Sequence, residues 1–195
     1  MIKENQILEI AKANKGIVTT KEITENNIPR IYITKLINEN KLYRVGRGIY
    51  SITNKSVDAY YSMQVQSSKI IFSHFTALEI QKFYKNIDSM KHISVLQGYN
   101  AKKFTDCKTF YNNENTYKIG LIDYMHNGQK IKVYDIERSV CDIIKDRNRF
   151  DASEYNKFIN YYFNNDHLNY KKLLEYSTCL RISKLVHHYL ALFKA

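Results

Sequence analysis

Residues 19–52 read TTKEITENNIPRIYITKLINENKLYRVGRGIYSI, which predicts a helix, a turn, a second helix and a β-hairpin in that order. Thr19 and Glu22 have the spacing of a capping box, in which each side chain satisfies an unpaired amide at a helix start. Asn26-Asn27 ends this short helix. Pro29 is expected in the first turn of the next helix, because its fixed φ is already helical and it has no N–H to leave unpaired.

The hairpin is indicated by the placement of glycine. Residues 42–45 and 49–52 predict two strands, which are joined by Gly46-Arg47-Gly48. The two glycines permit the positive φ angles of a tight turn. Arg47 is left at the tip with Arg44 close by, where an arginine can reach a phosphate or the minor groove. The order helix, turn, helix, hairpin predicts a winged helix-turn-helix module.

The second helix of this module has two chemically different faces. Ile33, Leu36 and Ile37 share one face at 3-4 spacing and should pack inward. The opposite face offers a cation, an amide, a hydroxyl and apolar groups, which is the chemistry of major-groove readout. The residues that we expect to contact DNA are Thr20, Arg30, Ile31, Thr34, Lys35, Asn38, Lys41, Arg44 and Arg47.

The distribution of charge supports DNA binding by the N-terminal part. The formal net charge of the chain is +11, which favours polyanionic partners. Residues 1–55 carry ten Lys/Arg and five Asp/Glu, whereas residues 56–195 carry twenty and fourteen. Between residues 28 and 55, six basic residues accompany a single acid, Glu39. Motif order and charge together predict double-stranded DNA as a partner.

Composition indicates a folded protein of one or two domains. The 195 residues are 44% apolar and 13% aromatic, enough to bury a core. No run approaches the apolar length of a membrane span, and Met1–Asn5 lacks the apolar segment of a signal peptide. Cys107, Cys141 and Cys179 are widely separated and form no metal-ligand pair. A reduced cytoplasm is therefore the expected location, with no membrane partner.

The chain as a whole predicts an α+β fold. Strands are expected at 70–72, 92–97, 108–111, 117–124 and 130–134, with a hairpin turn at 126–128. Helices are expected at 4–14, 58–66, 73–83 and 137–146, from 151 onward, and twice more before the end. The last helix carries an apolar stripe formed by Ile182, Leu185, Val186, Tyr189, Leu190 and Phe193. We expect a winged helix-turn-helix domain at 1–57 and a mixed domain at 58–195, with a small antiparallel sheet and packed helices.

Enzyme motifs are weak. Ser73, His74 and Asp142 can be written as a hydrolase triad, but adjacent side chains are expected to point apart. Ser73 is therefore interpreted as an N-cap and His74 as a residue that packs or bonds locally. Asp123 supplies only one strand carboxylate, too few for a nuclease metal site. Arg138 and Asp142 lie four apart, as in an ion pair on a helix face. We expect no catalytic residue, metal or cofactor.

The C-terminal part has two further possible binding roles, one for single-stranded nucleic acid and one for an acidic protein or flanking DNA. The seventeen tyrosines could stack on single-stranded nucleic acid, but most fall on apolar stripes and are expected in the core. The terminal helices could instead bind an acidic protein or flanking DNA through their polar faces. The basic residues on those faces are Lys171, Lys172, Arg181 and Lys184.

Three passages of the chain resemble one protein family when they are read together. They are KLYRVGRGIYSI at 41–52, SHFTAL at 73–78 and VYDIERSVCDIIKDRNRFD at 133–151. In this order they resemble the AbiE antitoxin (AbiEi) family of bacterial transcriptional regulators, from type IV toxin–antitoxin and abortive phage infection loci. The resemblance implies an N-terminal winged helix that binds inverted repeats in its own operon's promoter and represses it. It also implies a C-terminal domain that counters a cognate nucleotidyltransferase-like toxin.

An alternative function is that the winged helix binds promoters other than its own. In that reading the protein regulates other genes, and its C-terminal domain senses a ligand or binds a protein.

Overall fold

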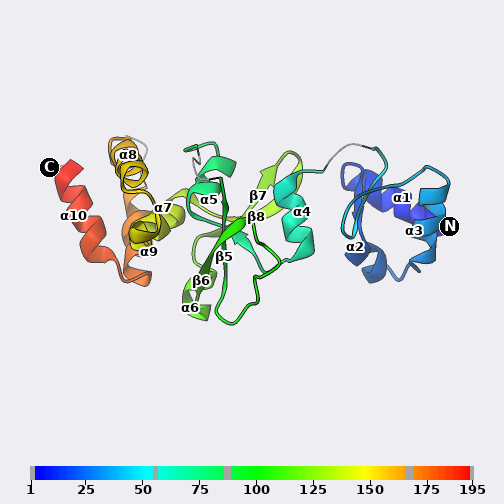
Figure 1. Ribbon diagram of the computed structural model, residues 1–195, viewed down its shortest axis with the longest axis horizontal. Coiled ribbons are helices and arrows are strands. Elements are labelled where there is room, and N and C mark those ends of the chain that lie inside the picture. The colour runs from blue at the N-terminus through cyan, green and yellow to red at the C-terminus, as the bar shows by residue number, and fades with distance from the viewer. Residues whose placement is uncertain (1–2, 55–56, 86–88, 166–168, 194–195) are drawn as a thin grey trace. The chain divides into compact units, whose positions relative to one another are not determined.

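The computed structural model describes residues 3–54, 57–85, 89–165 and 169–193 (Figure 1). The chain divides into two compact units. The first comprises Met1–Ser68 with Tyr124–Ile131, and the second comprises Lys69–Asp123 with Lys132–Ala195.

The first unit contains a winged helix-turn-helix module. Its elements are α1 (Lys3–Ala13), β1 (Ile17–Thr19), α2 (Thr20–Glu25), α3 (Ile31–Asn38), β2 (Tyr43–Gly46) and β3 (Ile49–Ser51). The three strands form an antiparallel sheet in the order β1-β3-β2. The short strand before α2 thus pairs with the hairpin and fastens it to the helices.

The start of α2 confirms the predicted capping box. The Glu22 amide donates to Thr19 Oγ1 at 3.2 Å, and the Thr19 amide donates to Glu22 Oε2 at 2.7 Å. Such a cap is worth about 1 kcal/mol. The expectation for Pro29 is wrong. Helix α3 begins only at Ile31, so Pro29 lies in the preceding turn, where its carbonyl accepts the amide of Tyr32 at 3.2 Å.

The core of this module comes from all three helices. The buried residues are Ile7, Ala11, Val18, Ile23, Ile28, Ile33, Leu36 and Leu42. The predicted inward face of α3 is confirmed, since Ile33 and Leu36 are buried and Ile37 packs against them. This core fixes which face of α3 remains exposed.

The wing turn is built differently from the expectation that both glycines take positive φ. Gly48 has φ +72°, but Gly46 is not in the left-handed region. The register shifts between Arg44 and Gly46, so that Gly46 still pairs with Ile49. The bulge absorbs one residue of β2 and leaves Arg47 and Gly48 as the loop.

A second sheet has five strands and mixed pairing. Its strands are β4 (Ile71–Phe72), β5 (Lys91–Leu96), β6 (Cys107–Asn112), β7 (Leu121–His126) and β8 (Gln129–Tyr134), in the order β6-β5-β4-β8-β7. Strands β4 and β5 are antiparallel, whereas β5–β6 and β4–β8 are parallel. The accompanying helices are α4 (Ala59–Gln66), α5 (His74–Ile80), α6 (Glu114–Tyr117), α7 (Ile136–Lys145), the 3₁₀ turn η1 (Arg147–Arg149), α8 (Ala152–Phe163), α9 (Tyr170–Cys179) and α10 (Ser183–Phe193). The predicted mixed α+β class is confirmed, but this sheet includes two parallel pairs where only antiparallel pairing was expected.

The region 117–128 contains one wrong and one confirmed prediction. Tyr117 ends helix α6 instead of opening a strand, because the Asn113 side chain caps that helix by accepting the Thr116 amide at 3.0 Å. Strand β7 starts only after Gly120, which has φ +69°. The hairpin turn is confirmed: Asn127 and Gly128 have φ values of +47° and +80°, as a type I′ turn requires.

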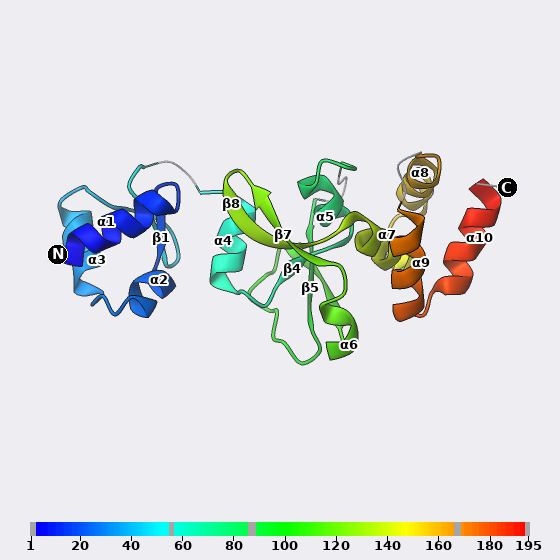
Figure 2. The same ribbon diagram turned by 180° about the vertical axis from the view of Figure 1, so that it is seen from behind.

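Helices α7 to α10 cluster together in the second unit (Figure 2). The buried members of their core include Tyr155, Phe158, Ile159 and Tyr162 of α8. The predicted stripe of α10 is confirmed. Ile182, just before the helix, and Val186 are buried, and the other four members pack against the same core.

Candidate nucleic-acid interface

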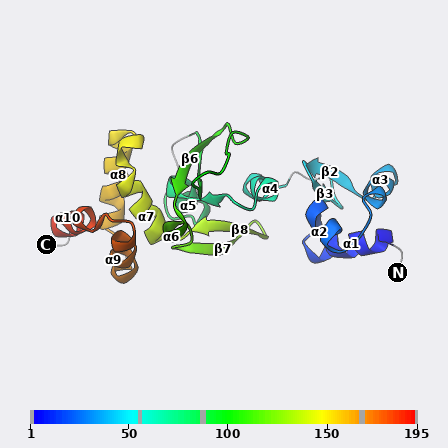
Figure 3. The ribbon, with the colours of Figure 1, turned by 90° about the horizontal axis from the view of Figure 1, so that it is seen from below.

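Helix α3 packs against α1 in the winged module (Figure 3), and its predicted DNA-contacting face is exposed to solvent. Thr34, Lys35 and Asn38 are exposed, and Ile31 is 69% exposed although it is a large apolar residue. The buried Ile33 lies on the opposite side of the helix. An exposed isoleucine beside a hydroxyl, a cation and an amide matches the apolar and polar groups of the major groove.

Two of the predicted cations already have acidic partners. Lys35 Nζ lies 2.6 Å from Glu4 Oε1 of α1, and Lys41 Nζ lies 2.7 Å from Glu39 Oε2. The hydrogen bond with Glu4 raises the pKa of Lys35, and the same bond lowers the pKa of Glu4. Glu4 was not among the residues predicted from the sequence, because no local pattern relates a residue in the first turn of α1 to one in α3.

The three arginines differ from these lysines. Arg30 precedes α3 as its N-cap residue, Arg44 lies on β2 opposite Tyr50, and Arg47 forms the wing tip. All three are exposed, and none makes an ion pair with another residue in the described part of the chain. Their charges can therefore contact phosphates without first being released from an acidic partner.

Thr20 has a structural role within the module. Its amide donates to the Gly48 carbonyl at 2.9 Å, and its hydroxyl lies 3.5 Å from the same oxygen. The first residue of α2 thus ties that helix to the wing. Thr20 is half-buried, so it offers DNA less surface than the residues of α3.

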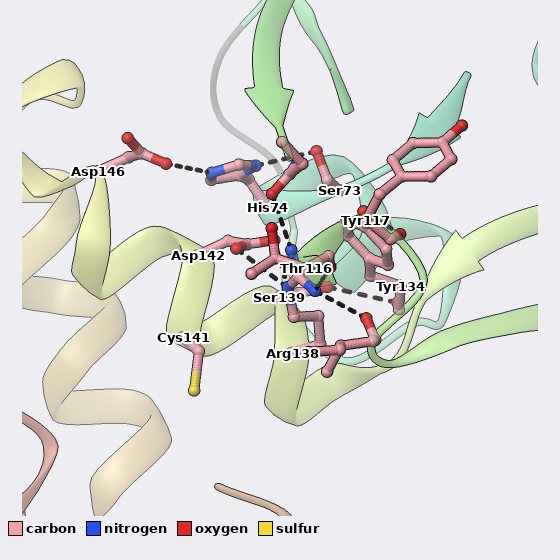
Figure 4. A network of polar contacts seen from close by, with 12 residues as sticks. Ser73, His74, Thr116, Tyr117, Tyr134, Arg138, Ser139, Cys141, Asp142 and Asp146 are labelled. Atoms are coloured by element: carbon pink, nitrogen blue, oxygen red, sulfur yellow. Dashed lines mark hydrogen bonds and ion pairs between the residues drawn. The ribbon is translucent and has the colours of Figure 1, made fainter. Parts of the chain in front are cut away.

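In the second unit, the predicted pair on α7 is confirmed as an ion pair but is buried (Figure 4). Arg138 Nε lies 3.1 Å from both carboxylate oxygens of Asp142. Its Nη1 donates to the carbonyls of Thr116 at 2.6 Å and Ile119 at 2.8 Å, and its Nη2 donates to Asn112 Oδ1 at 3.1 Å. Arg138 is fully buried, so this guanidinium links α7 to α6 and β6 and does not face solvent.

A second buried group corrects the expectation that adjacent Ser73 and His74 point apart. His74 Nδ1 lies 2.9 Å from Ser73 Oγ, and its Nε2 lies 3.2 Å from Asp146 Oδ2. His74 has φ +50°, and its ring stacks on Phe110 with centroids 3.6 Å apart. This left-handed start of α5 explains why the ring reaches Ser73, a geometry that helix spacing cannot predict.

The same group corrects two assigned roles. Ser73 occupies the N-cap position of α5, but its hydroxyl makes no capping bond. The acid beside His74 is Asp146, whereas Asp142 pairs with Arg138. Burial raises the pKa of Asp146, but the hydrogen bond from His74 and the positive charges nearby, including Lys145 and Arg149, together outweigh it and lower the pKa. Ser73 and His74 are at most 1% exposed.

No three His, Cys, Asp or Glu side chains in the described ranges gather where they could hold a metal ion. Over the same ranges, every helix is too short or too polar to cross a bilayer.

The fold and the exposed face of α3 define a winged helix-turn-helix protein with a basic wing. Residues 5–53 match the family described as "Transcriptional regulator, AbiEi antitoxin", which confirms the resemblance for the N-terminal module. The match supports a role as a DNA-binding regulator. No curated protein sequence matches the chain.

The chain is also similar to a solved structure over nearly its whole length. The crystal structure of the RV2827C protein from Mycobacterium tuberculosis superposes with a TM-score of 0.58, covering 97% of this chain and 77% of that one. The two sequences are 9% identical, so the similarity establishes the fold.

Proposed function

We propose that this protein is the transcriptional repressor and antitoxin of a type IV toxin–antitoxin, abortive-infection operon. Its winged helix binds inverted repeats in the operon's own promoter, and residues 58–195 counteract a nucleotidyltransferase-like toxin in the cytoplasm. The observation that carries the proposal is the exposed face of α3 beside a basic wing, within the residues that match AbiEi regulators.

In the proposed complex, α3 enters the major groove. Asn38 and Thr34 offer hydrogen bonds to base edges, and Ile31 offers contact with a thymine methyl. The arginines contact phosphates, which position the module without reading sequence. Residues 58–195 act without catalysis of their own: Ser73 and His74 are sealed from solvent, and Arg138 is engaged by protein groups. Both observations support a structural role for these residues.

We expect Asn38→Ala to reduce discrimination between the promoter and random DNA by ~1–3 kcal/mol, the value of a good bidentate base contact. Asn38 is exposed at the end of α3, so its truncation opens no cavity. The measurement is competition binding with promoter and random duplexes of equal length. Asn156→Ala, at an exposed position of α8, is the matched control. Equal losses on both duplexes would mean that Asn38 contacts only the backbone.

A second prediction separates repression from toxin neutralisation. The full chain carrying Arg44→Ala and Arg47→Ala should lose repression of a promoter reporter. It should still rescue growth when the toxin is expressed from an unrelated inducible promoter, because the wing is assigned to DNA alone. Loss of rescue by this variant, with the protein folded and present at the wild-type level, would show that the wing arginines also take part in toxin neutralisation.

The buried groups provide the complementary variants. Asp142→Asn and His74→Gln should leave rescue largely intact in molecules that remain folded, since both residues are assigned structural roles. Thermal melts accompany the growth assay, because loss of one partner of a buried pair is strongly destabilising. A well-folded variant that fails to rescue would point to chemistry at these residues.

Preferential binding of the protein to promoters elsewhere in the genome would favour the alternative function, a regulator of other genes.

A further inference from the structure

The pair formed by Glu4 and Lys35 differs from the other ion pairs of the winged module. The Glu4 side chain is 11% exposed, whereas the acids paired with Lys12, Lys21 and Lys41 are 36–64% exposed. The second oxygen of Glu4, Oε2, is buried and has no hydrogen-bond partner among the residues that the structure describes. The positive charge of Lys35 therefore provides the main compensation for the negative charge of a largely buried carboxylate. The carboxylate can reach water only if the side chain of Glu4 leaves the contact between α1 and α3.

This contact changes what Lys35 can offer to DNA. An unpaired lysine is a strongly hydrated point charge that binds phosphate wherever it finds one, and it increases affinity for every sequence. When a carboxylate binds the lysine, the pair has no net charge. The ammonium still has N–H donors besides the one whose hydrogen bond Glu4 accepts. Those donors suit the O6 and N7 acceptors of guanine.

We propose that Glu4 is a specificity-determining positioning residue, which neutralises and orients Lys35 so that this lysine reads a base edge instead of binding phosphate. The inference rests on the proposed function as a promoter-binding protein. It assigns non-specific affinity mainly to Arg30, Arg44 and Arg47. Lys41 remains a phosphate contact, because Glu39 is exposed at the surface and can release it.

The test compares Glu4→Gln with Glu9→Gln. Both changes remove one negative charge from α1, but Glu9 pairs with Lys12 at an exposed position. The salt dependence of binding is measured on a duplex from the protein's own promoter and on a random duplex of equal length. Glu4→Gln should steepen the log–log slope on random DNA by up to about 0.9, the value of one added phosphate contact. This corresponds to roughly 3-fold more affinity lost between 50 and 200 mM salt.

The preference for the promoter should fall in Glu4→Gln, because the affinity for random DNA rises more than the affinity for the promoter does. Glu9→Gln should change neither the slope by this amount nor the preference. A double variant, Glu4→Gln with Lys35→Gln, keeps the net charge of the pair at zero and removes both buried charge and ammonium. It should retain the wild-type salt slope while losing about 5-fold or more of the preference, the lower end of one base contact.

The outcomes distinguish this inference from the proposed function. One outcome is that the wild-type protein prefers its promoter, while Glu4→Gln and Glu9→Gln give the same salt slopes and the same preference as each other. Glu4 would then have no special role, and the proposed function would stand. If the double variant keeps the full preference, Lys35 reads no base and the inference is overturned. A wild-type protein that binds promoter and random duplexes equally overturns the proposed function itself. Thermal melts confirm that each variant compared is folded.

Discussion

Replacing Arg138 with Met should destabilise the second unit by roughly 3–5 kcal/mol, the cost of removing one partner from a buried ion pair. The guanidinium is fully buried and bonds a carboxylate, two carbonyls and an amide oxygen. Methionine has a similar volume but donates no hydrogen bond, so Asp142 would remain as an uncompensated buried charge. The loss should appear as a lower urea midpoint in tyrosine fluorescence and circular dichroism.

Arg147→Met is the control for this substitution, because Arg147 is exposed. It should change stability by less than about 0.5 kcal/mol. The double variant Arg138→Met with Asp142→Leu should recover part of the loss, since replacing a whole buried pair by apolar residues is often tolerated. If Arg138→Met unfolds at the same urea concentration as Arg147→Met, the guanidinium does not hold this unit together.

Changing Arg44 and Arg47 together to Ala should weaken promoter binding and flatten its salt dependence by about 1.8 log–log units, or 0.9 for each lost phosphate contact. Both side chains are exposed on the hairpin, and neither makes an ion pair within the described ranges. Affinity for promoter and random duplexes should fall in similar proportion, because phosphate contacts carry little sequence information.

Lys171→Ala with Lys184→Ala is the matched control for the wing variant. It removes two exposed positive charges from α9 and α10. If only the net charge of the protein mattered, the two double variants would behave alike. An unchanged salt slope in the wing variant would remove the hairpin from the interface. A flattened slope in the control would instead show that the terminal helices contact flanking DNA.

The winged module could be predicted because its determinants are local. The capping box at Thr19, the inward face of α3 and the glycine-rich wing all act within a few residues. The stripe of α10 is predictable for the same reason, since one helical period places its apolar residues on one side. Departures such as Pro29 and Gly46 concern a shift of one or two residues at the ends of elements.

The polar interior could not be predicted, because each of its contacts joins distant parts of the chain. The sequence spacing indicated that Arg138 and Asp142 would pair, but their burial depends on α6 and β6 closing over the guanidinium. The contact of His74 with Asp146 spans 72 residues and requires a left-handed backbone at the histidine. The partner of Lys35 lies in a different helix. Tertiary packing, and not residue periodicity, decides these contacts.

The pairing order of the second sheet has a consequence for synthesis on the ribosome. Strand β4 lies in the middle of that sheet, yet its parallel partner β8 is reached about sixty residues later, at Phe72 against Val133. The core of the winged module, by contrast, is complete once Leu42 and the hairpin have emerged. Nascent chains fold from the N-terminus, and non-local pairing is slow. The DNA-binding part therefore reaches its native form before the last strands of the second sheet have been synthesised. A chain whose translation stops early would therefore retain a folded DNA-binding module without the unit proposed to counter the toxin.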